Sequence, residues 1–171
     1  MKPIWHGGWA RSLRETMGSF LAQLEQSGVA TWIRESGVLY GYPLILFLHT
    51  LGLSTLVGLS SAIDLRILGF APGIPLKPLE KLFRIMWAGF ALNLATGTLL
   101  FIADATKHSS NPAYYVKLTF VACAVVILSL IRKKVFREQK DGKLLAAASL
   151  GCWFIAMSAA RLMAYIIEFI L

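Results

Sequence analysis

The chain has 171 residues, of which 57% are hydrophobic and only 15% carry a charge. Soluble domains are on average about 45–50% apolar and about 25% charged, so this composition excludes intrinsic disorder and disfavours a water-soluble globular domain. The formal net charge is +8, but the basic residues flank apolar segments without interleaved aromatic residues, which disfavours nucleic acid as the partner.

Residues 1–37 have the pattern of an amphipathic arm. They do not resemble a signal peptide, because no compact apolar core precedes a small-residue cleavage site. Apolar side chains recur at helical spacing over residues 13–24, and Ser27 and Gly28 interrupt the pattern before an apolar face resumes. We expect one or two helices on the outer membrane surface, or a docking surface for a membrane or periplasmic protein, and the two interpretations are compatible. The expected interfacial anchors are Trp5, Trp9 and Trp32.

Residues 38–171 contain four stretches long enough to cross a bilayer. A hydrocarbon core of about 30 Å requires roughly 20 apolar residues in a helix, and lipid offers no partner for a free backbone group. Short loops imply antiparallel neighbours. We therefore predict an all-α fold: an integral membrane, up-down four-helix bundle with an N-terminal amphipathic surface helix. The predicted spans are residues 38–63, 83–103, 113–131 and 144–171.

The loop charges predict the orientation of this bundle. The first and third loops are rich in lysine and arginine, whereas the second loop offers only Lys107. By the positive-inside rule, we expect the first and third loops to be cytoplasmic and both termini to be periplasmic, in a bacterial inner membrane. The basic residues of the first and third loops are Arg66, Lys77, Lys81, Arg132, Lys133, Lys134, Arg137, Lys140 and Lys143.

Each predicted span carries one polar or soft residue near the middle of the membrane. These residues are His49, Asn93, Cys123 and Arg161, and at 1.5 Å per residue each lies roughly 13–15 Å below the outer end of its helix. A mid-bilayer arginine costs about 2.5–3.5 kcal/mol on insertion scales. We expect Arg161 to face the bundle interior and meet Glu168, a carbonyl, Asn93 or an anionic group of a cofactor, lipid or partner. The alternative is an arginine that snorkels to water.

We expect His49 to serve as a metal ligand, as a proton relay or as a partner in an interhelical hydrogen bond. Haem b is one candidate cofactor, with His49 on the iron and Arg161 on a propionate, and Met163 or Met157 closer in depth than any second histidine. Copper, a less favoured candidate, would use the soft ligands His49, Cys123 and Met163. No paired CxxC or HExxH spacing supports a metal site, so the cofactor stays unknown.

The two cysteines are not expected to pair. Cys123 and Cys152 differ by roughly 13 Å in depth along the bundle axis, and a disulfide needs Cα atoms within about 7 Å. We expect both to be small buried apolar residues.

Small residues at four-residue spacing predict close helix packing. Gly89, Asn93 and Gly97 form one such row, and Ser54 and Gly58 belong to another. Such rows let helices approach closely. We expect packing within the bundle, the alternative being a docking face for another subunit or a cofactor ring. The expected packing positions are Gly52, Gly58, Gly89 and Gly97.

Several short motifs along residues 38–165 resemble a known group of proteins. The motifs include Leu48–Leu53, Asp64–Gly69, Trp87–Ala91 and Ala160–Leu162. They resemble an uncharacterised family of bacterial four-helix inner-membrane proteins, loosely akin to the copper-resistance membrane protein CopD and to cytochrome b561-like bundles. This resemblance implies the membrane-bundle fold. Such proteins often carry a second histidine near the cytoplasmic end of the third helix, where this chain has residues 130–133, Leu-Ile-Arg-Lys.

No catalytic triad, carboxylate pair or phosphate-binding glycine loop is visible, so we do not expect an enzyme. We expect a non-catalytic integral subunit that anchors or completes a larger redox or metal-handling assembly, with His49, Asn93 and Arg161 forming a polar midplane site. The partner would be a membrane or periplasmic protein or a second copy of the chain. The alternatives are a cytochrome b-like haem electron carrier that uses His49, and a copper or small-solute permease.

Overall fold

The computed structural model describes the backbone of residues 8–170 and the side chains of residues 12–13, 15–37, 40–163 and 165. Every regular element among residues 8–170 is helical, and no strand occurs there. The prediction of an all-α fold is confirmed.

Four helices are long and apolar enough to span a bilayer, which indicates a multi-pass membrane protein that contacts lipid. They are α4 (Tyr42–Leu68), α6 (Leu82–Ala103), α8 (Pro112–Ile131), which continues into the π-helix η1 (Arg132–Arg137), and α9 (Lys143–Ile170).

Helix α4 continues beyond residue 63, where the expected span ended. The first charged residue after the expected span is Asp64. Its side chain is fully buried, and helix α4 includes it. The helix ends at Gly69, whose φ of 106° places it in the left-handed region that favours glycine at a helix C-terminus.

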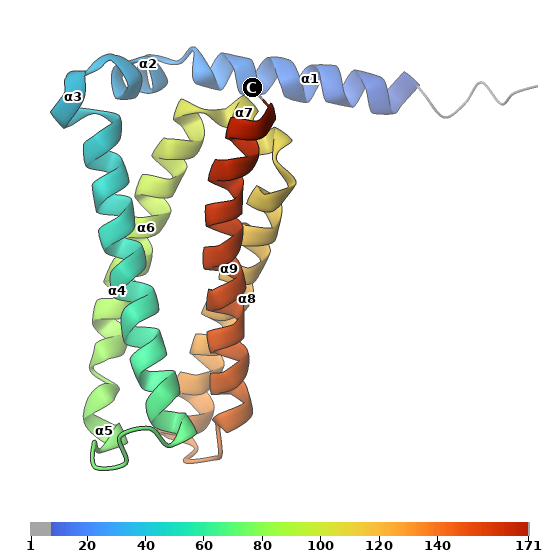
Figure 1. The fold of residues 1–171 in the computed structure, drawn as a ribbon. Helices are drawn as coiled ribbons and strands as arrows, with labels where there is room; N and C mark the ends of the chain where they lie inside the picture. The colour runs from blue at the N-terminus through green and yellow to red at the C-terminus, as the bar shows by residue number, and fades with distance from the viewer. Residues whose placement is uncertain (1–7, 171) are drawn as a thin grey trace, which may run out of the picture.

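The four long helices form two antiparallel hairpins (Figure 1). Helix α4 packs along α6, α8 packs along α9, and contacts between α4 and α9 join the hairpins. The short α5 (Leu76–Leu79) connects α4 to α6 at one end of the molecule. The apolar core lies in the half of the bundle nearest α5 and η1, and its most buried members are Leu56, Ile63, Phe83, Met86, Leu128, Ile131 and Trp153.

Two glycines allow the close approach of α4 and α6. A Cβ on Gly52 would lie 2.8 Å from the backbone oxygen of Gly89, and a Cβ on Gly89 would lie 3.1 Å from the backbone oxygen of Gly52. A Cβ on Gly97 would lie 3.0 Å from Cε1 of His49, so that glycine makes room for the imidazole. Gly58 differs from our expectation: it is exposed, and no atom lies within 4 Å of the position its Cβ would take.

The N-terminal arm crosses the end of the bundle opposite α5 (Figure 1). It consists of α1 (Gly8–Glu25), α2 (Gly28–Glu35) and α3 (Gly37–Tyr40), and lies at the same end as α7 (Ala105–Ser110). Ser27 separates α1 from α2 because its hydroxyl caps α2, accepting from the backbone N–H of Ala30. Trp5 and the side chain of Trp9 lie outside the described residues. The large apolar side chains that the described part of the arm exposes are Leu13, Met17, Phe20, Val29, Trp32 and Tyr40.

Candidate ligand site between the two hairpins

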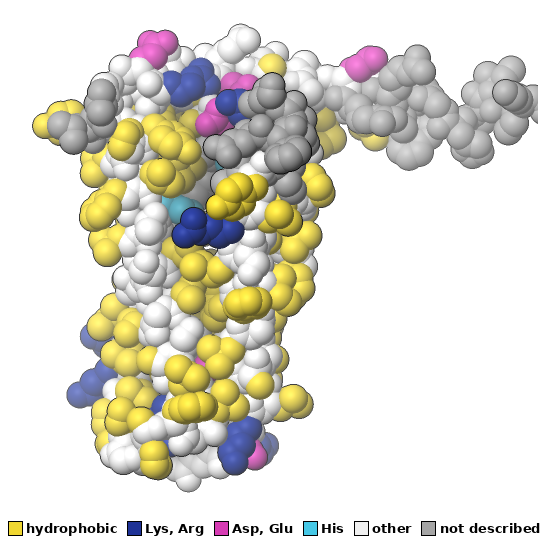
Figure 2. Space-filling view, viewed as in Figure 1, with side chains coloured by type: hydrophobic (Ala, Val, Ile, Leu, Met, Phe, Trp, Pro, Cys, Tyr) yellow, Lys and Arg dark blue, Asp and Glu magenta, His cyan; other side chains and the backbone are white. Residues whose placement is uncertain are grey.

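A cavity of about 330 Å³ lies between the hairpins, in the half of the bundle nearest the N-terminal arm. Figure 2 shows histidine atoms set back in a hollow on this face, with Lys or Arg atoms beside them. Most of the cavity wall is apolar and aromatic. Its main polar side chains are Tyr42, His49, Asn93, His108, Tyr114 and Lys117.

His49 is held in one orientation by helix α6. Its Nδ1 lies 3.1 Å from the backbone oxygen of Asn93 and 3.1 Å from Oγ1 of Thr96. A carbonyl oxygen only accepts, so Nδ1 carries a proton and donates it. Nε2 faces the side-chain amide of Asn93, whose Nδ2 lies 3.4 Å away. The Asn93 amide donates to the backbone oxygen of His49 at 3.0 Å and closes the contact between the helices. His49 and Asn93 therefore come together, and both ring nitrogens of His49 face groups of Asn93.

Lys117 supplies the cation of this cavity. It lies on α8, is partly buried, lines the cavity, and makes no ion pair with any of the described side chains. Cationic side chains inside membrane spans usually face an interior and mark a functional position. Lys117 was not identified from the sequence as a candidate site residue.

Arg161 does not take the place that we expected. It is exposed, is not part of the cavity wall, and makes no hydrogen bond or ion pair with the described side chains. The reason is the inward face of α9, which follows Ser149, Trp153, Ala156 and Ala159. Helical geometry places residue 161 away from this face, so Arg161 does not join His49 in the cavity wall. The side chain of Glu168, one of its predicted partners, lies outside the described residues.

Cys123 is also displaced from the predicted site. The inward face of α8 runs through Lys117, Val121, Ala124 and Leu128, and Cys123 lies off this face and is exposed. The prediction that Cys123 is buried is therefore wrong, although both cysteines are free thiols.

The predicted copper ligands are not assembled. Met163 and His49 both line the cavity, but Cys123 does not. The described residues contain no group of three or more His, Cys, Asp or Glu side chains that could hold a metal ion.

His108 of α7 forms part of the cavity wall, and it was not identified from the sequence as a site residue. Its Nδ1 donates to the backbone oxygen of Asp104 at 2.7 Å. Its ring contacts Tyr114 and Phe101, whose own rings stack with centroids 5.7 Å apart. The signal in the sequence was weak, since only the fold of the short α7 turns this histidine back toward the bundle.

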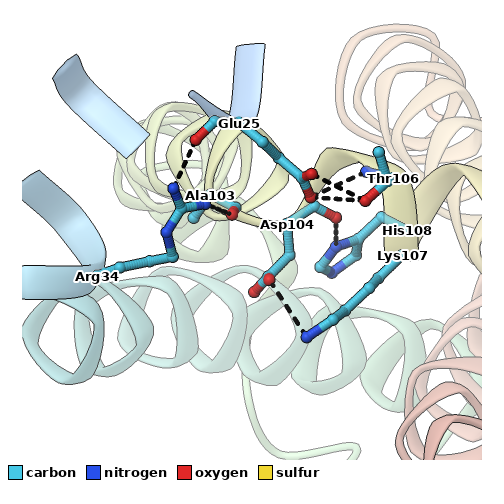
Figure 3. Close-up of polar contacts among 7 residues, drawn as sticks. All are labelled: Glu25, Arg34, Ala103, Asp104, Thr106, Lys107 and His108. Carbon is cyan, nitrogen blue, oxygen red and sulfur yellow. Dashed lines mark hydrogen bonds and ion pairs between the residues drawn. The ribbon is translucent and has the colours of Figure 1, made fainter. Parts of the chain in front are cut away.

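A polar cluster fastens the N-terminal arm to the bundle beside the cavity (Figure 3). The carboxylate of Glu25 accepts from the backbone N–H of Thr106 at 3.2 Å and from its hydroxyl at 2.8 Å. Arg34 donates to the backbone oxygens of Ala103 and Glu25 at 2.8 and 2.6 Å. These contacts join α1 and α2 to α6 and α7.

No family model matches the sequence, and comparison with curated proteins and with solved structures finds no match.

Proposed function

We propose that the protein is a non-catalytic integral subunit of the bacterial inner membrane that holds the anionic head of an amphiphilic ligand between its hairpins. The observation that carries this proposal is the position of Lys117, a cation on a membrane-spanning helix that lines the same cavity as the orientated imidazole of His49. Among the side chains that the structure describes, those lining the cavity include no carboxylate and no thiol, which favours binding over covalent chemistry.

The polar side chains of the cavity wall favour an anionic head group. A lysine ammonium donates only, so it prefers a carboxylate or phosphate oxygen. Removing a cation from water is costly unless an anion accompanies it, and the described side chains supply none to Lys117.

The size of the cavity favours a head group with its tail in lipid. Small-molecule pockets measure about 300–1,000 Å³, and this one, at about 330 Å³, lies near the lower limit. Apolar wall residues such as Leu94, Leu118 and Val121 suit the first carbons of a chain.

A second candidate is a cytochrome b-like haem carrier. One observation favours it: His49 and Met163, both able to ligate haem iron, line the same cavity. A haem protein would show a Soret band that disappears in His49→Ala, whereas the leading proposal expects none.

The test compares Lys117→Gln with a matched control, Lys107→Gln. Lys107 is a lysine with a 58% exposed side chain that pairs with Asp104 at 3.6 Å, outside the cavity. Native mass spectrometry of protein purified in mild detergent should show an anionic amphiphile on the wild type and on Lys107→Gln. Hydrogen bonds to charged groups contribute about 1.5–3 kcal/mol, so Lys117→Gln should weaken retention about 10- to 100-fold.

The identity of the released molecule distinguishes a phospholipid from a free fatty acid. Equal retention by Lys117→Gln and the wild type would contradict the proposal.

A further inference from the structure

A second polar cluster lies in the other half of the bundle, between α4 and α9. Asp64 and Ser60 of α4 and Ser149 of α9 are each 0% exposed, and Trp153 of α9 is 2% exposed. None of these residues lines the cavity described above. Burying a carboxyl group between two membrane-spanning helices costs free energy, and such groups usually have a function.

The hydrogen bonds of this cluster have a fixed direction. The indole Nε1 of Trp153 donates to Oγ of Ser60 at 3.1 Å, and an indole nitrogen never accepts. The hydroxyl of Ser60 therefore directs its own proton onward, to Oδ2 of Asp64 at 3.4 Å. Oδ2 is the accepting oxygen of the carboxyl group.

The two serines depart from the usual behaviour of hydroxyls in this bundle. Thr50, Thr55, Thr98, Thr119 and Ser129 each donate to the backbone oxygen four residues earlier, at 2.8–3.1 Å. This bond is the ordinary way to satisfy a hydroxyl inside a helix.

Ser60 does not donate to the backbone oxygen four residues earlier. Its hydroxyl donates to Oδ2 of Asp64 instead. Ser149 also lacks the backbone bond: its side chain lies beside the Asp64 carboxyl, but its oxygen has no hydrogen-bond partner.

Two buried oxygens at the centre of the cluster have no partner. They are Oδ1 of Asp64 and Oγ of Ser149. An ionised carboxylate accepts about four hydrogen bonds, but the hydroxyls of Ser60 and Ser149 are the donors beside this one, so the charged form is poorly supported there.

No basic group compensates for the charge of Asp64. Of the basic groups near this end of the bundle, Arg66 on α4 donates to the backbone oxygens of Pro72 and Ile74, while Arg84 on α6 and Lys143 on α9 are exposed. None forms an ion pair with Asp64 among the described side chains.

We propose that Asp64 is a proton-binding site in the interior of the bundle, which carries a proton on Oδ1 and donates it to Oγ of Ser149. This single proton gives each of the two oxygens a partner and extends the chain of donors from Trp153 through Ser60 and Asp64 to Ser149. The chain then links α4 to α9 at the contact that joins the two hairpins.

The observations favour a proton over a metal cation. Hard cations take about six to eight oxygen ligands, whereas this cluster offers two unpartnered oxygens. A proton needs one donor and one acceptor, which is what the two oxygens provide.

Infrared spectroscopy of the wild-type protein tests the proposal without relying on a variant. The chain contains three aspartates, Asp64, Asp104 and Asp141, so carbon-13 labelling of aspartate side chains reports on three carboxyl groups. At neutral pH we expect one isotope-sensitive band of a protonated acid, which shifts to lower frequency in deuterium oxide. Asp64→Asn should remove this band, and Asp141→Asn, a change at an exposed loop residue, should leave it intact.

Ser149→Ala supplies a second readout. Loss of the acceptor should move the acid band to higher frequency, because the proton on Oδ1 then has no hydrogen bond. If the labelled wild type shows no protonated-acid band at neutral pH, Asp64 is ionised and the proposal fails. It also fails if the band is present in potassium chloride and vanishes in sodium chloride, because the site then binds a cation.

Discussion

Individual glycines decide how closely the first hairpin can pack. The backbones of Gly52 and Gly89 face each other without side chains, and this approach brings Asn93 within hydrogen-bonding distance of His49. The site therefore depends on residues that contribute no chemistry themselves. Small residues have this role in membrane helix pairs, where lipid removes the hydrophobic advantage of burial.

Gly52→Ala should destabilise the protein. The new methyl group would lie 2.8 Å from the backbone oxygen of Gly89, which cannot rotate away. Overpacking of this kind typically costs about 1–3 kcal/mol, and thermal unfolding in detergent should show it as a lower midpoint. Gly58→Ala is the matched control, because its methyl group meets open space. Equal midpoints for the two variants would show that α4 and α6 are not held this closely.

At the scale of whole elements, the inward face of each helix decides which polar residues meet. The sequence predicted the helices and the polar character of their centres, and the partnership of His49 with Asn93 follows from their similar depth. Depth alone could not identify the cation of the site. Lys117 and Arg161 both lie in spans, but only Lys117 shares a face with inward-pointing Val121, and the rotation of α8 and α9 is fixed by packing that a single sequence does not show.

Asp64 was missed for a related reason. In the sequence it stands near the end of an apolar stretch, where an aspartate normally reaches water. Its burial depends on Trp153 and Ser149, which are distant in the chain and meet it only after α9 packs against α4.

The arm is an element whose position depends on one carboxylate. Glu25→Ala should release α1 from the bundle, because Thr106 would lose the acceptor for its backbone N–H and its hydroxyl. Hydrogen bonds to charged groups contribute about 1.5–3 kcal/mol, so hydrogen–deuterium exchange should become faster across residues 8–25 and stay unchanged in α4. Glu15→Ala alters an exposed glutamate of the same helix and should leave exchange as in the wild type. Equal exchange in both variants would mean that Glu25 does not hold the arm.

For the molecule as a whole, charge is distributed unequally between its two ends. Ten of the 17 lysines and arginines lie within residues 66–84 or 132–143, at the end that carries α5 and η1 (Figure 1). The other end carries the arm and α7, where Lys107 is the basic residue between the two central spans. Retention of basic loops on the cytoplasmic side would place the arm and the mouth of the cavity toward the periplasm.

This orientation can be tested with single cysteines in a Cys123→Ala, Cys152→Ala background. Ser109→Cys places a thiol on α7, and Lys140→Cys places one in the loop between η1 and α9. On intact spheroplasts, a membrane-impermeant maleimide should label the first variant, and it should label the second only after the membrane is permeabilised. The reverse pattern would invert the topology and place the arm in the cytoplasm. Labelling of both variants before permeabilisation would contradict the placement of the two sites on opposite sides of one bilayer.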